Sequence, residues 1–229
     1  MIKAILFDKD GTLLEFSDIW TKGFKKLIYK LGLDDGNHDN LKYEIGIAND
    51  GEVLENSVLS SGTIKDLADV IIKYKKITNL EKYIEDIFIE TIEENSTEIR
   101  PTCDLDELFR FLKEQDIKII VSTSDNLKVA EKMFEILELR DQLDFIIAAD
   151  QFPPKPDPTS IEFIKEKFKI LSDEILMVGD SKVDMEYGKN VRSSVGVLCG
   201  TGSEPMLREF GDFVIDNPLE LIDLIYKFE

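Results

Sequence analysis

The chain has 229 residues, of which 43% are hydrophobic and 33% are charged, and its formal net charge is −19. These proportions indicate a folded protein of one large domain, or of a core domain plus a smaller one, and argue against a disordered chain. The negative charge also argues against a protein that binds nucleic acid or an anionic membrane, because their phosphates would be repelled. No apolar run approaches the ~20 residues of a membrane span, and no signal peptide opens the chain, so we expect a cytoplasmic location.

The first apolar run, residues 3–7, leads directly into Asp8-Lys9-Asp10-Gly11-Thr12. This pattern predicts a buried strand that ends in a polar turn containing glycine. Asp8 and Asp10 occupy alternating positions and would share one face, where two close carboxylates stay ionised together only beside a cation. The pair therefore indicates a metal-dependent site. The sequence leaves open whether Lys9 contacts a phosphate or points away.

Residues 15–97, called here the helical segment, show apolar residues at helical spacing and almost no strand pattern. The spacing predicts about four helices, the first capped by Ser17, with loops at 34–39, 48–51 and 60–63. His38 falls in the first of these loops, and we expect it to have no function. The segment would be an all-helical domain inserted after the first strand, beside a core formed by residues 1–14 and 98–229.

After residue 98, predicted strands and helices alternate along the chain. The strands are expected at 117–122, 145–148, 175–179, 195–199 and 213–215, and the helices at 105–115, 127–137, 160–168, 184–191 and 219–228. Continuous apolar strands separated by helices predict an α/β fold, a Rossmann-like parallel sheet that is joined by the first strand and flanked by helices. Ligands of such sheets bind beyond the carboxyl ends of the strands.

Four segments would deliver polar groups to that edge of the sheet. They carry the carboxylates of Asp8, Asp10, Asp180 and Asp184, the hydroxyls of Ser122 and Thr123, and the ammonium group of Lys155. Oxygen ligands of this kind favour Mg²⁺, and a carboxylate can act as a nucleophile while a second one transfers protons. Gly11 would let the backbone approach a phosphate closely, and Lys155, in a proline-rich loop, would supply positive charge.

These residues resemble the four motifs of the haloacid dehalogenase (HAD) superfamily, and specifically its helical-cap phosphatases similar to phosphoglycolate phosphatase. The first motif is Asp8-Lys9-Asp10-Gly11-Thr12, and the second is the strand that ends at Ser122, where Thr123 follows at once and the register could shift by one. The third is Lys155-Pro156-Asp157-Pro158, and the fourth runs from Gly179-Asp180-Ser181 to Asp184. The resemblance covers essentially the whole chain.

The resemblance implies a role for each motif residue. Asp8 would be the nucleophile and a Mg²⁺ ligand, and Asp10 the general acid and base, with its backbone carbonyl on the metal. Ser122, helped by the Thr123 backbone, would bind the transferring phosphoryl group. Lys155 would stabilise its charge, Asp180 would ligate the metal, and Asp184 would lie in or just outside the coordination sphere. Dehalogenases of the family lack the second aspartate, so Asp10 favours phosphoryl transfer.

The predicted activity is therefore a Mg²⁺-dependent phosphatase that acts on a small phosphorylated metabolite through an aspartyl-phosphate. A phosphosugar mutase of the β-phosphoglucomutase kind is an alternative built on the same motifs, and a non-catalytic binding protein that keeps the fold is a third. The helical segment would be a cap whose loops, such as 47–51 or 60–63, contact the substrate. The absence of a basic cluster there favours a small monophosphate over a polyanion. The sequence does not indicate an oligomeric state.

Overall fold

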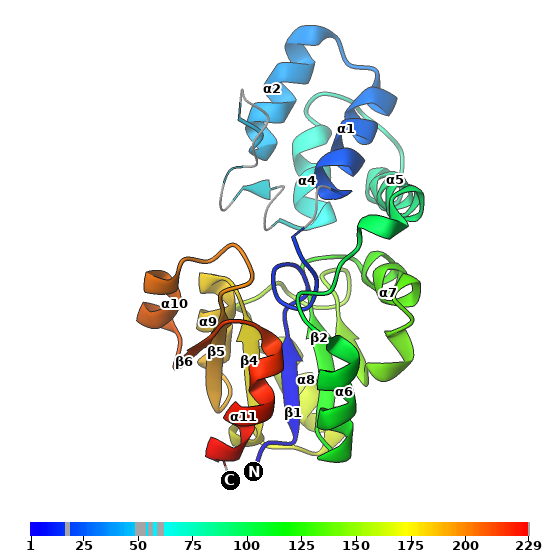
Figure 1. Ribbon diagram of the computed structural model, residues 1–229. Coiled ribbons are helices and arrows are strands. Elements are labelled where there is room, and N and C mark those ends of the chain that lie inside the picture. Colours follow the sequence, from blue (N-terminus) through cyan, green and yellow to red (C-terminus); the bar gives the residue numbers. More distant parts are fainter. Residues whose placement is uncertain (17–18, 49–53, 55–56, 59–61, 229) are drawn as a thin grey trace.

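The computed structural model describes residues 1–16, 19–48, 54, 57–58 and 62–228, and within them six parallel strands form one sheet (Figure 1). The strands run in the order β3-β2-β1-β4-β5-β6. Their bounds are β1 Ala4–Phe7, β2 Lys118–Ser122, β3 Phe145–Ile147, β4 Ile175–Gly179, β5 Ser193–Val197 and β6 Phe213–Ile215. The α/β fold with a Rossmann-like parallel sheet is thus confirmed.

The fully buried strand β1 lies at the centre of the sheet and sets the level of its carboxyl edge. Phe7 pairs with Val121 of β2 and with Val178 of β4, so the residues that follow these three strands emerge side by side. Strand β5 begins two residues earlier than the predicted 195–199. Its first residues are serines, which carry no apolar signal, but Ser194 pairs with Met177 inside the sheet.

Helices cover both faces of the sheet (Figure 1). The helices α6 (Leu105–Glu114), α7 (Leu127–Ile136) and α11 (Leu221–Leu224) contribute to the larger hydrophobic core, and α8 (Thr159–Phe168) and α9 (Lys182–Gly188) to a second cluster on the other face. The predicted helix 219–228 is divided into α11 and two short 3₁₀ turns. Helix α10 (Glu204–Phe210) was missed because Leu207 is its only buried residue.

The helical segment lies beyond the carboxyl ends of the strands (Figure 1). Its described helices are α1 (Ile19–Leu31), α2 (Asp35–Ile45), α4 (Ile64–Ile71) and α5 (Leu80–Glu94). Helix α5 packs against α1 and α4, and on its other side against α7 of the core. Over the residues described, the segment consists of helices and loops apart from one bridge residue, Ile47.

The predicted loop 34–39 is wrong, because helix α2 begins within it and includes His38. The side chain of Asp34 accepts a hydrogen bond from the Asn37 amide at 2.9 Å and caps the helix. The only buried apolar residues of α2 are Leu41 and Ile45, so the sequence shows only a weak helical pattern there. Ser17 and most of the predicted loops 48–51 and 60–63 lie outside the described residues.

The chain passes from the sheet to the helical segment and back at one point. The amide of Glu15 donates to the Arg100 carbonyl at 2.8 Å, and that of Thr102 to the Leu13 carbonyl at 3.0 Å. The two connections are therefore held together directly above the edge of the sheet, which is consistent with an insertion after β1. The division into two domains stays a prediction. Among the described residues, every helix is too short or too polar to cross a membrane.

Candidate active site

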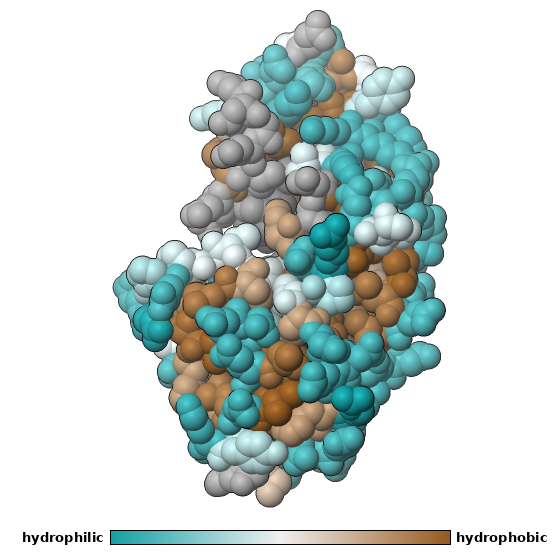
Figure 2. Space-filling model, in the orientation of Figure 1, coloured by the Kyte–Doolittle hydropathy of each residue, from teal (hydrophilic) through white to brown (hydrophobic). Residues whose placement is uncertain are grey.

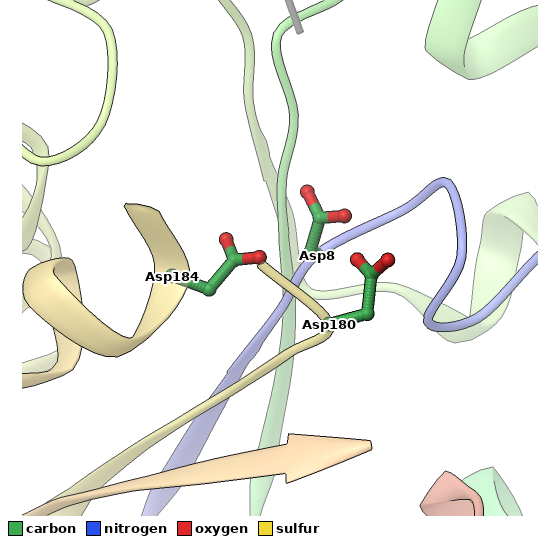
Figure 3. A group of neighbouring side chains, drawn as sticks. All are labelled: Asp8, Asp180 and Asp184. Atoms are coloured by element: carbon green, nitrogen blue, oxygen red, sulfur yellow. The ribbon is translucent and has the colours of Figure 1, made fainter. Parts of the chain in front are cut away.

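Three carboxylates converge at the carboxyl edge of the sheet (Figure 3). Asp8 directly follows β1, Asp180 directly follows β4, and Asp184 lies in the first turn of α9. One oxygen of each lies within 4.8 Å of the others. Residues from the first and the fourth sequence motif therefore meet in one cluster, as the parallel topology requires.

Lys155 lies between two of these acids. Its Nζ donates hydrogen bonds to Asp8 Oδ1 at 2.6 Å, to Asp184 Oδ1 at 2.7 Å and to the carbonyl of Ser122 at 3.1 Å. All three protons of the ammonium group are therefore engaged. Burial alone would lower the pKa of Lys155, but the carboxylates of Asp184 and Asp8 raise it above its ordinary value. Lys155 thus stays positively charged.

Asp184 is fixed through both of its oxygens. Besides the contact of Oδ1 with Lys155, its Oδ2 accepts from the Ser181 amide at 3.1 Å and from the Ser181 hydroxyl at 2.6 Å, which closes a capping box at the start of α9. A Cβ on Gly179 would lie 2.3 Å from Asp184 Cγ, so glycine is needed at that position. These contacts define the position of Asp184 beside the other acids.

Asp180 depends on two further residues for its position. Its Oδ2 accepts from the Thr201 amide at 2.6 Å and from the Thr201 hydroxyl at 3.0 Å. Gly11 has a φ of +79°, and a Cβ there would lie 2.5 Å from Asp180 Oδ2. The Gly11 amide donates to the Leu14 carbonyl at 2.7 Å. Gly11 therefore makes room for Asp180, and its own amide is not free for the phosphate contact that the sequence suggested.

The three acids repel one another. Burial first, and then the charges of Asp184 and Asp180, raise the pKa of Asp8 well above its usual range, although Lys155 opposes this shift. Burial and Asp184 likewise raise the pKa of Asp180. A divalent cation would remove this repulsion, and a set of carboxylate oxygens fits Mg²⁺ by its chemistry.

The sequence left open whether Lys9 contacts a phosphate. In the structure Lys9 is fully buried and does not line the cavity. Its Nζ lies 2.6 Å from Asp10 Oδ2, 2.9 Å from Asp125 Oδ2 and 5.0 Å from the centre of the Trp20 ring. The other oxygen of Asp10, Oδ1, is buried without a hydrogen-bond partner. Lys9 therefore holds Asp10 by one oxygen and leaves the second available.

Asp125 was missed by the sequence analysis. Burial and the charge of Asp10 raise its pKa to about 6, while Lys9 opposes the shift. The sequence held one signal for Asp125, namely Lys9 in the first motif. A lysine that lies between two aspartates at a strand end, and that is buried, needs a further acidic partner. Thr201 was also missed, although Gly200-Thr201-Gly202 follows a predicted strand directly.

The two hydroxyl residues at the end of β2 differ in position. Ser122 is buried below the cavity, and its side chain interacts with Tyr187 on the far side of the sheet. Thr123 and Ser124 line the cavity. The Thr123 amide donates to the Ile147 carbonyl at 2.9 Å, and its hydroxyl oxygen accepts from the Asp125 amide at 3.1 Å. The amide of Thr123 is thus occupied, and its side chain also hydrogen-bonds to the Asp125 carboxylate.

A cavity of about 510 Å³ lies over these groups, between the sheet and the helical segment. Asp8, Asp10, Lys155, Asp180 and Asp184 all line it. The outline of the molecule is indented where the helical segment meets the core (Figure 2). The size suits a small metabolite.

We predict that Lys9→Met destabilises the fold by roughly 3–5 kcal/mol, because it leaves the carboxylates of Asp10 and Asp125 buried beside each other without a cation. The measurement is chemical unfolding at pH 7. The double variant Lys9→Met/Asp125→Asn should recover a large part of the loss, since it also removes one of the two charges. Equal stability of the wild type and Lys9→Met would show that the buried cation is not needed.

Comparisons with known proteins agree with this geometry. The family model "Haloacid dehalogenase-like hydrolase" matches residues 5–197. The chain is 32% identical to "Putative pyrophosphatase PpaX" of Clostridium perfringens, over 99% of both chains. It is 25% identical to a phosphoglycolate phosphatase of Aquifex aeolicus, over 98% of this chain and 97% of the other. The crystal structure of a β-phosphoglucomutase from Clostridium difficile shares the fold, with a TM-score of 0.67 at 21% identity over 100% and 97% of the two chains.

The family model covers most of the chain, and its match spans all four motifs whose side chains meet at the edge of the sheet. Relatives that match almost the full length carry the names of phosphatases. This chain belongs to the haloacid dehalogenase-like hydrolases and is a phosphatase enzyme.

Proposed function

We propose that the protein hydrolyses a small-molecule phosphate monoester in a Mg²⁺-dependent reaction, with Asp8 as the nucleophile. The observation that carries the proposal is the environment of Asp8. Lys155 holds Oδ1, whereas no hydrogen bond or ion pair from the described part of the chain reaches Oδ2. Asp10 lines the same cavity with one oxygen free of hydrogen-bond partners.

The reaction would proceed in two displacements. The free oxygen of Asp8 attacks phosphorus, the bond to the ester oxygen breaks, and protonated Asp10 gives its proton to the departing alcohol. Asp10, now ionised, takes a proton from water, which attacks the aspartyl-phosphate. The Asp8 carboxylate and inorganic phosphate are released. Lys9 positions Asp10 for both transfers through the contact at Oδ2.

The Mg²⁺ ion would be held by Asp8 and Asp180, with the backbone carbonyl of Asp10 and with Asp184 in or beside the coordination sphere. When bound, the ion neutralises charge on the phosphoryl oxygens. Asp180 keeps Oδ1 for this purpose, because Thr201 contacts only Oδ2. Asp184 also orients Lys155, which balances the charge on Asp8.

Thr123 is the better candidate for the hydroxyl that binds the phosphoryl group. Thr123 lines the cavity, whereas Ser122 is 1% exposed and offers its carbonyl to Lys155. The shift by one residue that the sequence left open is thus supported. Ser122 would act by holding Lys155.

The mutase alternative has less support than hydrolysis. A phosphosugar mutase must bind a polar sugar in two orientations, and the side of the cavity formed by the helical segment is mainly apolar. The fold shared with a β-phosphoglucomutase does not distinguish the two activities.

We predict that Asp8→Asn lowers Mg²⁺-dependent phosphate release from an aryl phosphate by a factor of at least about 10³, because the amide is a poor nucleophile. Asp39→Asn removes the same charge from the exposed face of α2 and should leave the rate unchanged. Undiminished turnover by pure Asp8→Asn protein would contradict the proposal.

We predict that metal-free protein is less stable at pH 7 than at pH 5. The pKa values of Asp8, Asp180 and Asp125 are raised in the fold, so the folded state binds more protons than the unfolded state above about pH 4. Stability is then lost as the pH rises through these raised values. Mg²⁺ at a hundred times its dissociation constant should add about 2.7 kcal/mol. One fixed Mg²⁺ concentration should raise Tm more at pH 7 than at pH 5, because fewer protons then compete for the carboxylates.

The control for the metal effect is Asp180→Asn. The asparagine oxygen can still accept the two hydrogen bonds from Thr201, while one negative charge is removed from the cluster. This variant should be more stable than the wild type without metal at pH 7, and Mg²⁺ should shift its Tm less. An identical Mg²⁺ shift in the two proteins would rule out Asp180 as a ligand.

A further inference from the structure

The two sides of the cavity differ in charge. Among the described residues, the core supplies every charged side chain that lines it, namely the five carboxylates of Asp8, Asp10, Asp125, Asp180 and Asp184 and the ammonium groups of Lys155 and Lys182. The described part of the helical segment contributes six apolar or aromatic residues, Phe16, Trp20, Val58, Ile64, Leu67 and Phe88, together with Gly62 and Thr63. On the side of the helical segment, the described lining that a leaving group would face is therefore uncharged.

Both cations of the cavity belong to the core and already have partners. Lys155 uses its three protons on Asp8, Asp184 and the carbonyl of Ser122. Lys182 is 52% exposed, and its Nζ lies 4.2 Å from the centre of the Phe210 ring and 3.8 Å from Glu186 Oε1. Lys182 is therefore engaged with α10 and with its own helix.

The helical segment has no other cation to offer at this surface. It contains no arginine, and none of residues 17–18, 49–53, 55–56 and 59–61 is lysine, arginine or histidine. None of its lysines lines the cavity, and several pair elsewhere, as Lys26 does with Glu94 at 2.7 Å and Lys30 with Glu90 at 2.6 Å. The hydroxyl of Thr63 is also engaged, because it donates to Asp66 and accepts from the Asp66 amide.

We infer that the natural substrate, within the proposed phosphatase activity on which this inference rests, is a monoester of an uncharged alcohol with an apolar, aromatic or alkyl face. A carboxylate or second phosphate on the leaving group would lose its hydration against an apolar surface and would find no cation there. The five carboxylates of the cavity would repel it further. An apolar face would instead be removed from water against Phe16, Ile64 and Leu67.

The test compares kcat/KM of the wild-type protein with Mg²⁺ for benzyl phosphate, 2-phosphoglycolate and inorganic pyrophosphate. Both leaving groups are primary alcohols that Asp10 would protonate in the same way, so a difference between the first two reports binding of the leaving group rather than its reactivity. We expect benzyl phosphate to be favoured at least about tenfold over each of the others, a ratio typical of one well-matched apolar contact.

A charge introduced into the apolar surface should change this preference. Phe16 is 37% exposed and lines the cavity, so Phe16→Arg adds a cation with little cost to the core. This variant should reduce the preference for benzyl phosphate over 2-phosphoglycolate at least fivefold. Tyr43→Arg is the matched control, because Tyr43 is 75% exposed on α2, lies outside the cavity lining and receives the same charge. It should leave the preference unchanged.

The outcomes separate this inference from the proposed function. Hydrolysis of 2-phosphoglycolate or pyrophosphate as efficient as that of benzyl phosphate, and abolished by Asp8→Asn, would overturn the inference and leave the phosphatase mechanism intact. An unchanged preference in folded Phe16→Arg protein would also overturn it. Failure to release phosphate from any of the three would contradict the proposed function, and with it the inference.

Discussion

The repulsion among three clustered carboxylates, only partly balanced by one lysine, is the constraint on which the rest of the site depends. Asp8, Asp180 and Asp184 cannot all be ionised comfortably around Lys155 alone, and the raised pKa values of Asp8 and Asp180 express this. The acids lie close despite their repulsion because the parallel sheet brings the ends of β1 and β4 together. A bound metal cation, alone or together with a phosphoryl group, would offset this negative charge. Binding at the site should therefore also stabilise the fold.

The neighbouring residues limit how this repulsion can be relieved. Ser181 and Thr201 each hold one carboxylate by a backbone amide and a hydroxyl, so these acids cannot turn away from Asp8. Gly11 and Gly179 leave space that any side chain would fill. Lys9, Asp10 and Asp125 form a second ion cluster that shares no contact with the first. It has one lysine for two carboxylates, whereas the first has one lysine for three. The site thus contains one incomplete and one more nearly complete ion cluster.

The sequence predicted the edge of the sheet well because strand ends and acidic motifs are local features. Asp8, Asp180 and Lys155 are brought together by topology alone, and the parallel order follows from alternating strands and helices. The hydroxyl at the end of β2 was uncertain, because only the pairing of Ser122 with Ile147 shows which residue remains within the sheet. Side-chain contacts between distant segments, such as Lys9 with Asp125, have no periodic signal. The start of α2 and the whole of α10 were missed for a related reason, since each helix buries too few apolar residues to show a helical period.

The central claim is that Asp8 carries the phosphoryl group during turnover. The most direct measurement uses the Asp10→Asn variant with a ³²P-labelled phosphate monoester, quenched in acid and digested, because loss of the base should slow hydrolysis of the intermediate. The account predicts label on the peptide that contains Asp8, released by hydroxylamine as expected of an acyl phosphate, and no label when Asp8 is also replaced by asparagine. Phosphate release by the wild type without any labelled Asp8 peptide in the Asp10→Asn protein, or label on another residue, would contradict it.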